Sequence, residues 1–134
     1  MTATTEARNT KRRNAERVTH VVNAGSTIYA GTLVTLLTAT GLAVPAGTAS
    51  AGVVVGVAQS TVIGDGVQTV EVERGFAYQF ANSTGAELIT KADIGNTCWL
   101  MDNQTVSKTD GVGLRKAAGK IIDVDAGGVW VLVG

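Results

Sequence analysis

Residues that support catalysis, metal binding or disulfide formation are scarce in this chain, as are proline and aromatic residues. The 134 residues include one cysteine (Cys98), one histidine (His20), one proline (Pro45) and two each of Trp, Tyr and Phe. A single cysteine cannot form an internal disulfide, so the fold does not depend on an oxidising compartment. The sequence has no run of 18 apolar residues and no apolar leader, so we expect a soluble protein made in the cytoplasm.

The few residues with catalytic or ligating chemistry are poorly placed for it. His20 lies close to a polar N-terminal segment, and a strand-edge histidine is the favoured interpretation. Cys98 stands beside Trp99 and Leu100, with no base near it in the sequence, so we expect a small buried apolar side chain. A zinc site would need at least two carboxylates besides these two residues. We therefore expect no catalytic residues, no metal, no cofactor and no enzyme activity.

Three further patterns resemble functional motifs without meeting their requirements. Glu71 and Glu73 share a strand face and could form a hydrolase dyad, but a solvated acidic face is the commoner case. The segment 113–120 lacks the spacing and the Ser or Thr of a phosphate loop. The segment 123–127 begins like a calcium loop, but Gly127 replaces an oxygen ligand.

The residues that are abundant predict strands and turns. Val, Thr and Ala recur in short runs separated by 17 glycines. The predicted strands are 18–23, 32–37, 41–44, 53–58, 69–80, 97–101, 105–107, 120–125 and 129–133. The run 53–58 is almost continuously apolar, as in a strand covered on both faces. The sequence therefore predicts one mainly-β domain, 18–134, built as a small barrel or sandwich with one short helical turn.

The segment 69–80 has the clearest alternation. Its even positions are Val70, Val72, Arg74, Phe76, Tyr78 and Phe80. Strand side chains alternate between faces, so one face is apolar except for Arg74. The alternation continues through Gly75, which predicts a twelve-residue strand that bends there. Two interpretations of Arg74 stay open: a side chain extended over the barrel rim, or an intersubunit salt bridge.

Two local signals mark the C-terminal third. Thr90–Asp93 fits a capping box that Ile94 and Gly95 terminate, which predicts the single helical turn. The segment 120–133 reads as a hairpin with its tip at 126–128. Both faces of its last strand are apolar, and only one can face the core, so Trp130 and Leu132, with Arg74, form a candidate subunit interface.

The N-terminal segment, residues 1–17, differs from the rest of the chain. It has no aliphatic side chain larger than alanine after Met1, and five bases against two acids give it a charge of +3. The remaining residues hold six bases and nine acids, or −3. A segment without an apolar face cannot offset its own ordering entropy. We expect a flexible basic arm that docks on a partner, through Arg8, Lys11, Arg12, Arg13 and Arg17. A solvated tail and a nucleic-acid contact are the alternatives.

The body resembles the head decoration, or capsid cement, proteins of tailed bacteriophages over about Gly25 to Gly134. The resemblance rests on the segments Ala30–Leu36, Val54–Gln59, Val70–Phe80, Ala92–Gly111 and Ala118–Gly134. It implies a small β-rich fold, a barrel-like or tulip-like module, usually trimeric, that binds the outside of the expanded head at local threefold positions. Such a protein stabilises the head against DNA pressure, and its N-terminal arm often pairs with capsid elements.

The resulting expectation is a virion structural protein whose partners are the major capsid protein and further copies of itself. Membrane and nucleic-acid partners are not expected. The alternative is a ligand- or carbohydrate-binding β module on a virion or cell surface. Against a sugar-binding platform, Phe76, Tyr78 and Phe80 are expected in the core.

Overall fold

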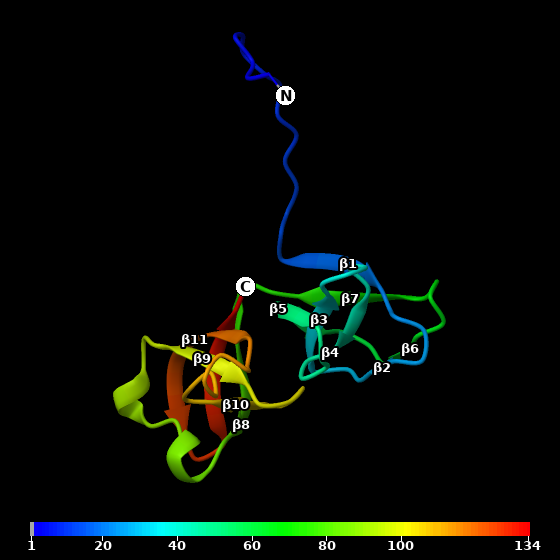
Figure 1. Ribbon diagram of the computed structural model, residues 1–134. Coiled ribbons are helices and arrows are strands. Elements are labelled where there is room, and N and C mark those ends of the chain that lie inside the picture. Colours follow the sequence, from blue (N-terminus) through cyan, green and yellow to red (C-terminus); the bar gives the residue numbers. More distant parts are fainter. Residues whose placement is uncertain (1) are drawn as a thin grey trace.

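Short β-branched segments separated by glycine form twelve strands and two 3-10 turns in the computed structural model, which describes residues 2–134 (Figure 1). The elements are β1 (Arg17–Val21), β2 (Thr27–Ile28), β3 (Leu33–Leu37), β4 (Ala43–Pro45), β5 (Ala51–Ala58), β6 (Val62–Ile63), β7 (Thr69–Glu73), β8 (Phe76–Asn82), η1 (Gly85–Glu87), η2 (Lys91–Asp93), β9 (Thr97–Leu100), β10 (Thr105–Ser107), β11 (Ala117–Asp125) and β12 (Gly128–Val133). They form an open sheet, a closed barrel and a two-stranded ribbon, which confirms the mainly-β prediction with a small barrel.

The first half of the chain forms the open sheet, in the order β1-β7-β5-β3-β4 with antiparallel neighbours. Its buried core consists of Val22, Ile28, Val34, Ala43, Ala58, Val70 and Val72. The ribbon, β2 paired with β6, packs on this core through Ile28 and Val62. We call the sheet and ribbon together the sheet unit. It was not predicted from the sequence.

The second half forms the barrel, in the order β10-β8-β12-β11-β9. Four of its five strand pairs are antiparallel, and the fifth, β10 with β8, is parallel. The pairing of β9 with β10 closes the ring. Its core includes the side chains predicted to face inward on the last strand, Val129, Val131 and Val133, all with no exposed surface. In Figure 1 the barrel lies to the left of the sheet unit.

The chain passes from the sheet to the barrel at Gly75. This residue has a φ of 87°, a conformation that favours glycine, so the predicted bend is confirmed. The prediction of one twelve-residue strand is wrong, because β7 and β8 belong to different sheets. The backbone hydrogen bonds pass from the sheet to the barrel at this point. The N–H of Arg74 donates to the carbonyl of Glu16 at 2.8 Å, and the N–H of Gly75 donates to the carbonyl of Val133 at 2.6 Å.

The prediction that three aromatic residues of this segment lie in the core is wrong for Phe76. Phe80 is 6% exposed and Tyr78 packs against the barrel core, but Phe76 is 47% exposed. Phe76 is the first residue of β8, at the end of the barrel, where no further layer of side chains covers it. The regular alternation therefore identified the face of Phe76 but not its burial.

Strand β5 contributes to both cores. Val54 and Val57 pack in the barrel core, and Val55 and Ala58 pack in the sheet core. The predicted coverage of both faces is thus confirmed over this part of the strand. Val53 differs, being 57% exposed. Because side chains of one strand enter both cores, the two units share apolar contacts as well as a covalent link.

The predicted C-terminal elements are present. The hairpin consists of β11 and β12, and η2 is the predicted turn, where the N–H of Thr90 donates to the carboxylate of Asp93 at 2.8 Å. A second turn, η1, was not predicted, although Thr84 and Glu87 have the same spacing as Thr90 and Asp93. No helix in residues 2–134 is long and apolar enough to span a membrane.

Candidate interaction surface

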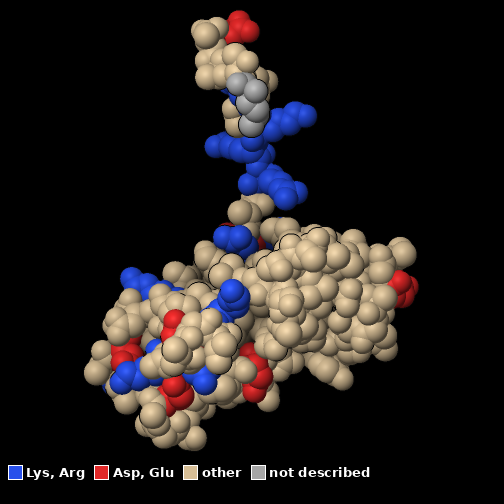
Figure 2. Space-filling view, in the orientation of Figure 1, with Lys and Arg blue, Asp and Glu red and all other residues tan. Residues whose placement is uncertain are grey.

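The N-terminal arm extends away from both units. Every residue from 2 to 16 is exposed, and Figure 2 shows a cluster of basic side chains on the projecting segment. Residues 2–13 form only local hydrogen bonds, such as the N–H of Thr10 to the carbonyl of Arg8 at 3.1 Å. The arm bases Arg8, Lys11, Arg12 and Arg13 are therefore presented to solvent, where they can meet a partner's negative charges.

Arg17 differs from the other four predicted docking residues, because its own fold engages it. It is the first residue of β1, and its guanidinium donates to Glu71 at 2.7 Å and to Glu73 at 2.9 Å. Hydrogen bonding to Glu71 and the charge of Glu73 raise the pKa of Arg17. Glu71 and Glu73, considered above as a hydrolase dyad, thus fix the base of the arm.

The join between arm and body has a second contact. The carbonyl of Glu16 accepts the N–H of Arg74, as described above, so the last arm residue continues the pairing of β1 with β7. The Arg74 side chain is half-buried, and its Nη2 lies 3.5 Å from the backbone oxygen of Gly134. Within residues 2–134 Arg74 forms no ion pair. A shallow hollow lined by Arg74, Gly75, Gly134 and residues 14–16 lies at this join.

Trp130 and Leu132 lie on the outer face of the barrel, as their alternation with buried valines predicted. Leu132 is 36% exposed and Trp130 is half-buried. The indole N–H of Trp130 donates to the carboxylate of Asp125 at 2.9 Å, and Gln79 donates to the same carboxylate at 2.8 Å. The ring of Trp130 is therefore held in place by its own subunit. The role of these residues in a subunit interface stays a prediction.

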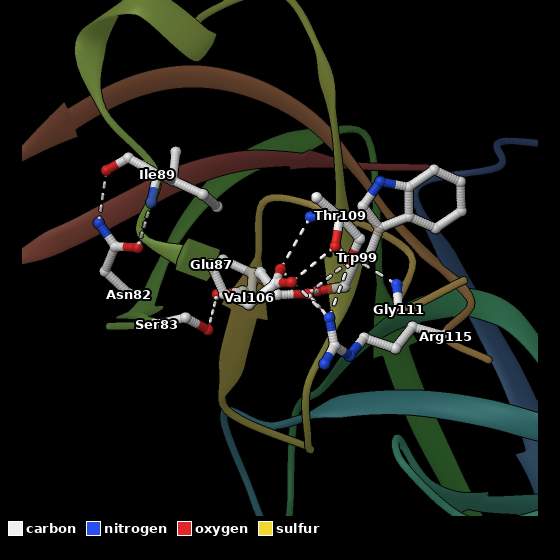
Figure 3. Close-up of polar contacts among 10 residues, drawn as sticks. Asn82, Ser83, Glu87, Ile89, Trp99, Val106, Thr109, Gly111 and Arg115 are labelled. Atoms are coloured by element: carbon white, nitrogen blue, oxygen red, sulfur yellow. Dashed lines mark hydrogen bonds and ion pairs between the residues drawn. The ribbon is translucent and has the colours of Figure 1, made fainter. Parts of the chain in front are cut away.

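The barrel carries a polar cluster that the sequence did not indicate (Figure 3). The Thr109 hydroxyl donates to Glu87 at 2.6 Å, and Arg115 lies 3.2 Å from the same carboxylate. Arg115 also donates to the carbonyl of Thr109 at 3.1 Å, and the buried Ser107 hydroxyl donates to that carbonyl at 3.0 Å. These contacts tie η1 to the loop after β10. The two contacts of Glu87 join residues more than 20 positions apart in the sequence, so no local pattern indicates them.

The single histidine and the single cysteine lie in different sheets, His20 in β1 and Cys98 in β9. Cys98 is fully buried, and burial raises its pKa to about 12. His20 lies in β1, half-buried, and burial lowers its pKa. Within residues 2–134 no group of three His, Cys, Asp or Glu side chains could hold a metal ion.

A cleft of about 210 Å³ opens between the sheet unit and the barrel. It is lined by Thr35, Leu100, Met101, residues 47–52 and residues 114–116. Hydroxyl, aliphatic and two basic side chains make up this lining, and the guanidinium of Arg115 already binds Glu87. No acid or histidine lines the cleft, so among the described residues it offers no acid–base pair.

Comparison with known proteins gives no match: no family model, no curated protein and no solved structure is similar to this chain. The functional argument therefore depends on the residues and the geometry above.

Proposed function

We propose that this protein is a structural decoration, or cement, protein of a tailed-bacteriophage head. In this proposal it binds the outer surface of the expanded head at local threefold positions, as a homotrimer, and stabilises the head against DNA pressure. Its partners are the major capsid protein and other copies of itself, and its location is the virion. The observation that carries the proposal is the exposed basic arm joined to a compact β body by a fixed base.

The arm has the charge and length that docking requires. Residues 2–16 hold four bases and two acids, and none of the bases is bound by the body. Fully extended, fifteen residues reach on the order of 50 Å. Such a segment loses conformational entropy when it is ordered, so it binds only where a partner supplies a complementary groove. If only the expanded lattice forms this groove, the protein should bind mature heads in preference to immature heads.

The fixed base directs the arm. Because Glu16 and Arg17 are held by β7 and its neighbouring turn, the arm leaves the body at a defined point. A trimer would present three such arms together, and linked sites bind far more tightly than one site alone. Weak contacts by single arms are then sufficient for stable attachment.

The test is co-sedimentation of the purified protein with expanded, undecorated heads of the phage that encodes it. The double variant Arg12→Gln/Arg13→Gln should bind at least about tenfold more weakly, since charged contacts to an acidic surface are lost. The matched control is Lys116→Gln/Lys120→Gln, which removes two exposed bases from the barrel. Binding of the wild type should also weaken with added salt.

A deletion gives a stronger variant, and the structure defines its limit. Removing residues 2–13 leaves the contacts of Glu16 and Arg17 intact, whereas a deletion through residue 17 would also remove the salt bridges to Glu71 and Glu73. Full binding by the deletion variant, or no binding by the wild type, would contradict the proposal. Specific signal on a glycan array, or a salt-sensitive gel shift with DNA, would support the ligand-binding or nucleic-acid alternative instead.

A further inference from the structure

The cleft between the sheet unit and the barrel has fixed walls. The two units meet through their backbones, because the N–H of Leu33 donates to the carbonyl of Asn103 at 2.9 Å. Gly47 lines the cleft, and a Cβ added there would lie 3.3 Å from the Cα of Asp102, so this turn packs directly against the barrel. Strand β5 also contributes to both cores. The cleft is therefore formed by the protein alone, as is usual for small-molecule sites.

One wall of the cleft contains a strained residue. Ser50 has a φ of 61°, a left-handed conformation that is costly for any residue but glycine. The N–H and the hydroxyl of Thr38 both donate to the Ser50 carbonyl at 3.0 Å, which holds the turn in place. The Ser50 hydroxyl is exposed and donates to no group within residues 2–134. Strained residues are concentrated at binding sites, so Ser50 is an indication of a ligand site that is independent of the cleft's shape.

The lining supplies positive charge and free hydrogen-bond donors. Lys116 is exposed and forms no ion pair within residues 2–134. Arg115 binds Glu87 and the carbonyl of Thr109 through one terminal nitrogen, Nη1 (Figure 3), and its Nε and Nη2 form no hydrogen bond with the described residues. Because Glu87 balances the charge of Arg115, the charge available to a ligand comes from Lys116. Free donors in a lining without a carboxylate suit an anion that only accepts hydrogen bonds.

We propose that this cleft binds a small oxyanion, a phosphate or a carboxylate group, through Lys116, the free guanidinium nitrogens of Arg115 and the hydroxyl of Ser50. Leu100, Met101 and Leu114 also line the cleft and provide aliphatic contacts for the rest of the ligand. Ser50 belongs to the sheet unit and Lys116 to the barrel half, so one ligand contacts both units. This site goes beyond the proposed function, because it involves neither the arm nor the head.

The test is nuclear magnetic resonance of the isotope-labelled full-length protein, titrated with sodium phosphate or sodium acetate at constant ionic strength. The amide signals of residues 47–52 and 114–116 should shift and reach saturation. Lys116→Gln should weaken this binding about tenfold, since a hydrogen bond to a charged group is lost. Lys120→Gln is the matched control, because Lys120 is also an exposed lysine of the barrel half but does not line the cleft. It should leave the affinity unchanged.

A second variant tests the role of the strained serine. Ser50→Gly removes the hydroxyl, and glycine adopts a φ of 61° without the strain. This variant should therefore melt at the same temperature as the wild type or higher, and it should bind the oxyanion more weakly. Weaker binding by a protein of equal or greater stability cannot result from loss of the fold. Unchanged affinity in Ser50→Gly would exclude the hydroxyl from the site.

The two anions distinguish the source of the ligand. Tighter binding of phosphate would assign the cleft to a phosphate group, and tighter binding of acetate to a carboxylate; either result supports an oxyanion site. Shifts confined to residues 8–17 would show that the anions bind only the basic arm, and would overturn the inference. Equal affinities of Lys116→Gln and Lys120→Gln would also overturn it. No heads are present in this experiment, so failure of head binding would contradict the proposed function alone.

Discussion

The sheet unit and the barrel are similar in size and both are built from short strands, but they differ in how their surfaces and polar groups are used. In the barrel, charged side chains form ion pairs that tie segments together, as between Lys91 and Asp123 at 3.2 Å and between Arg115 and Glu87 at 3.2 Å. The sheet unit has no such pair apart from the contacts of Arg17 at its edge, within residues 2–134. The two units thus share part of one core but differ in how far charged side chains fix their surfaces.

The largest predicted effects come from the two cores. Ile28→Ala in the sheet core and Ile121→Ala in the barrel core should each reduce the free energy of unfolding by about 2–5 kcal/mol, since both side chains are fully buried. Because β5 contributes to both cores, each variant should still unfold in one transition. Urea unfolding followed by far-ultraviolet circular dichroism and by tryptophan fluorescence measures this.

Tryptophan fluorescence reports on unfolding of the barrel, because Trp99 and Trp130 both lie in barrel strands. Circular dichroism reports on both units. A second probe is Cys98, whose buried thiol should react with a thiol reagent only when the barrel opens. If Ile28→Ala shifts the circular dichroism transition but leaves the fluorescence midpoint and the Cys98 reaction rate unchanged, the units unfold independently and the shared-core argument is wrong.

A smaller effect is predicted at the link between the units. Gly75→Ala should cost about 1–3 kcal/mol, because the added Cβ makes the φ of 87° unfavourable. Its new Cβ would lie 3.9 Å from the nearest atom, the Cγ of Glu16, so the cost comes from the backbone and not from a clash. Gly52→Ala in β5, where φ is not positive and the nearest atom is also 3.9 Å away, is the control and should be nearly neutral. If the two variants have the same free energy of unfolding, the claim that the positive φ at position 75 requires glycine is wrong.

The smallest effect concerns pH. Hydrogen bonds from Thr109, with Arg115 nearby, hold the pKa of Glu87 below its usual value of 4.5. A carboxylate with a lower pKa in the folded state stabilises the fold above its unfolded pKa, and that contribution disappears as the pH falls through the folded value. Glu87→Gln should therefore lower the melting temperature at pH 7, and the difference from wild type should shrink below pH 4.

Asp65→Asn provides the corresponding measurement in the sheet unit. Backbone hydrogen bonds from Gln68 and Val67 lower the pKa of Asp65, and an asparagine side-chain oxygen can still accept them. At pH 7 its melting temperature should lie closer to that of the wild type than the melting temperature of Glu87→Gln does. If Asp65→Asn lowers the melting temperature more than Glu87→Gln does, the carboxylate that contributes more to stability lies in the sheet unit. That result would contradict the claim that charged side chains stabilise mainly the barrel.

The sequence by itself determined the features that depend on neighbouring residues. The alternation of Val129, Val131 and Val133 identified the buried face of β12, the capping pattern at Thr90 identified η2, and Gly75 identified the bend. The separation of a polar basic arm from an apolar body was also evident, because it is a matter of composition. These signals are local, since strand periodicity, turn conformation and solvation act within a few residues.

Only the tertiary structure decided which strands pair and which side chains meet across them. The division into two units at Gly75, the exposure of Phe76, the engagement of Arg17 by Glu71 and Glu73, and the cluster around Glu87 each depend on residues far apart in sequence. Pairing of distant segments depends on the packing of the whole core, so no local pattern in the chain encodes it.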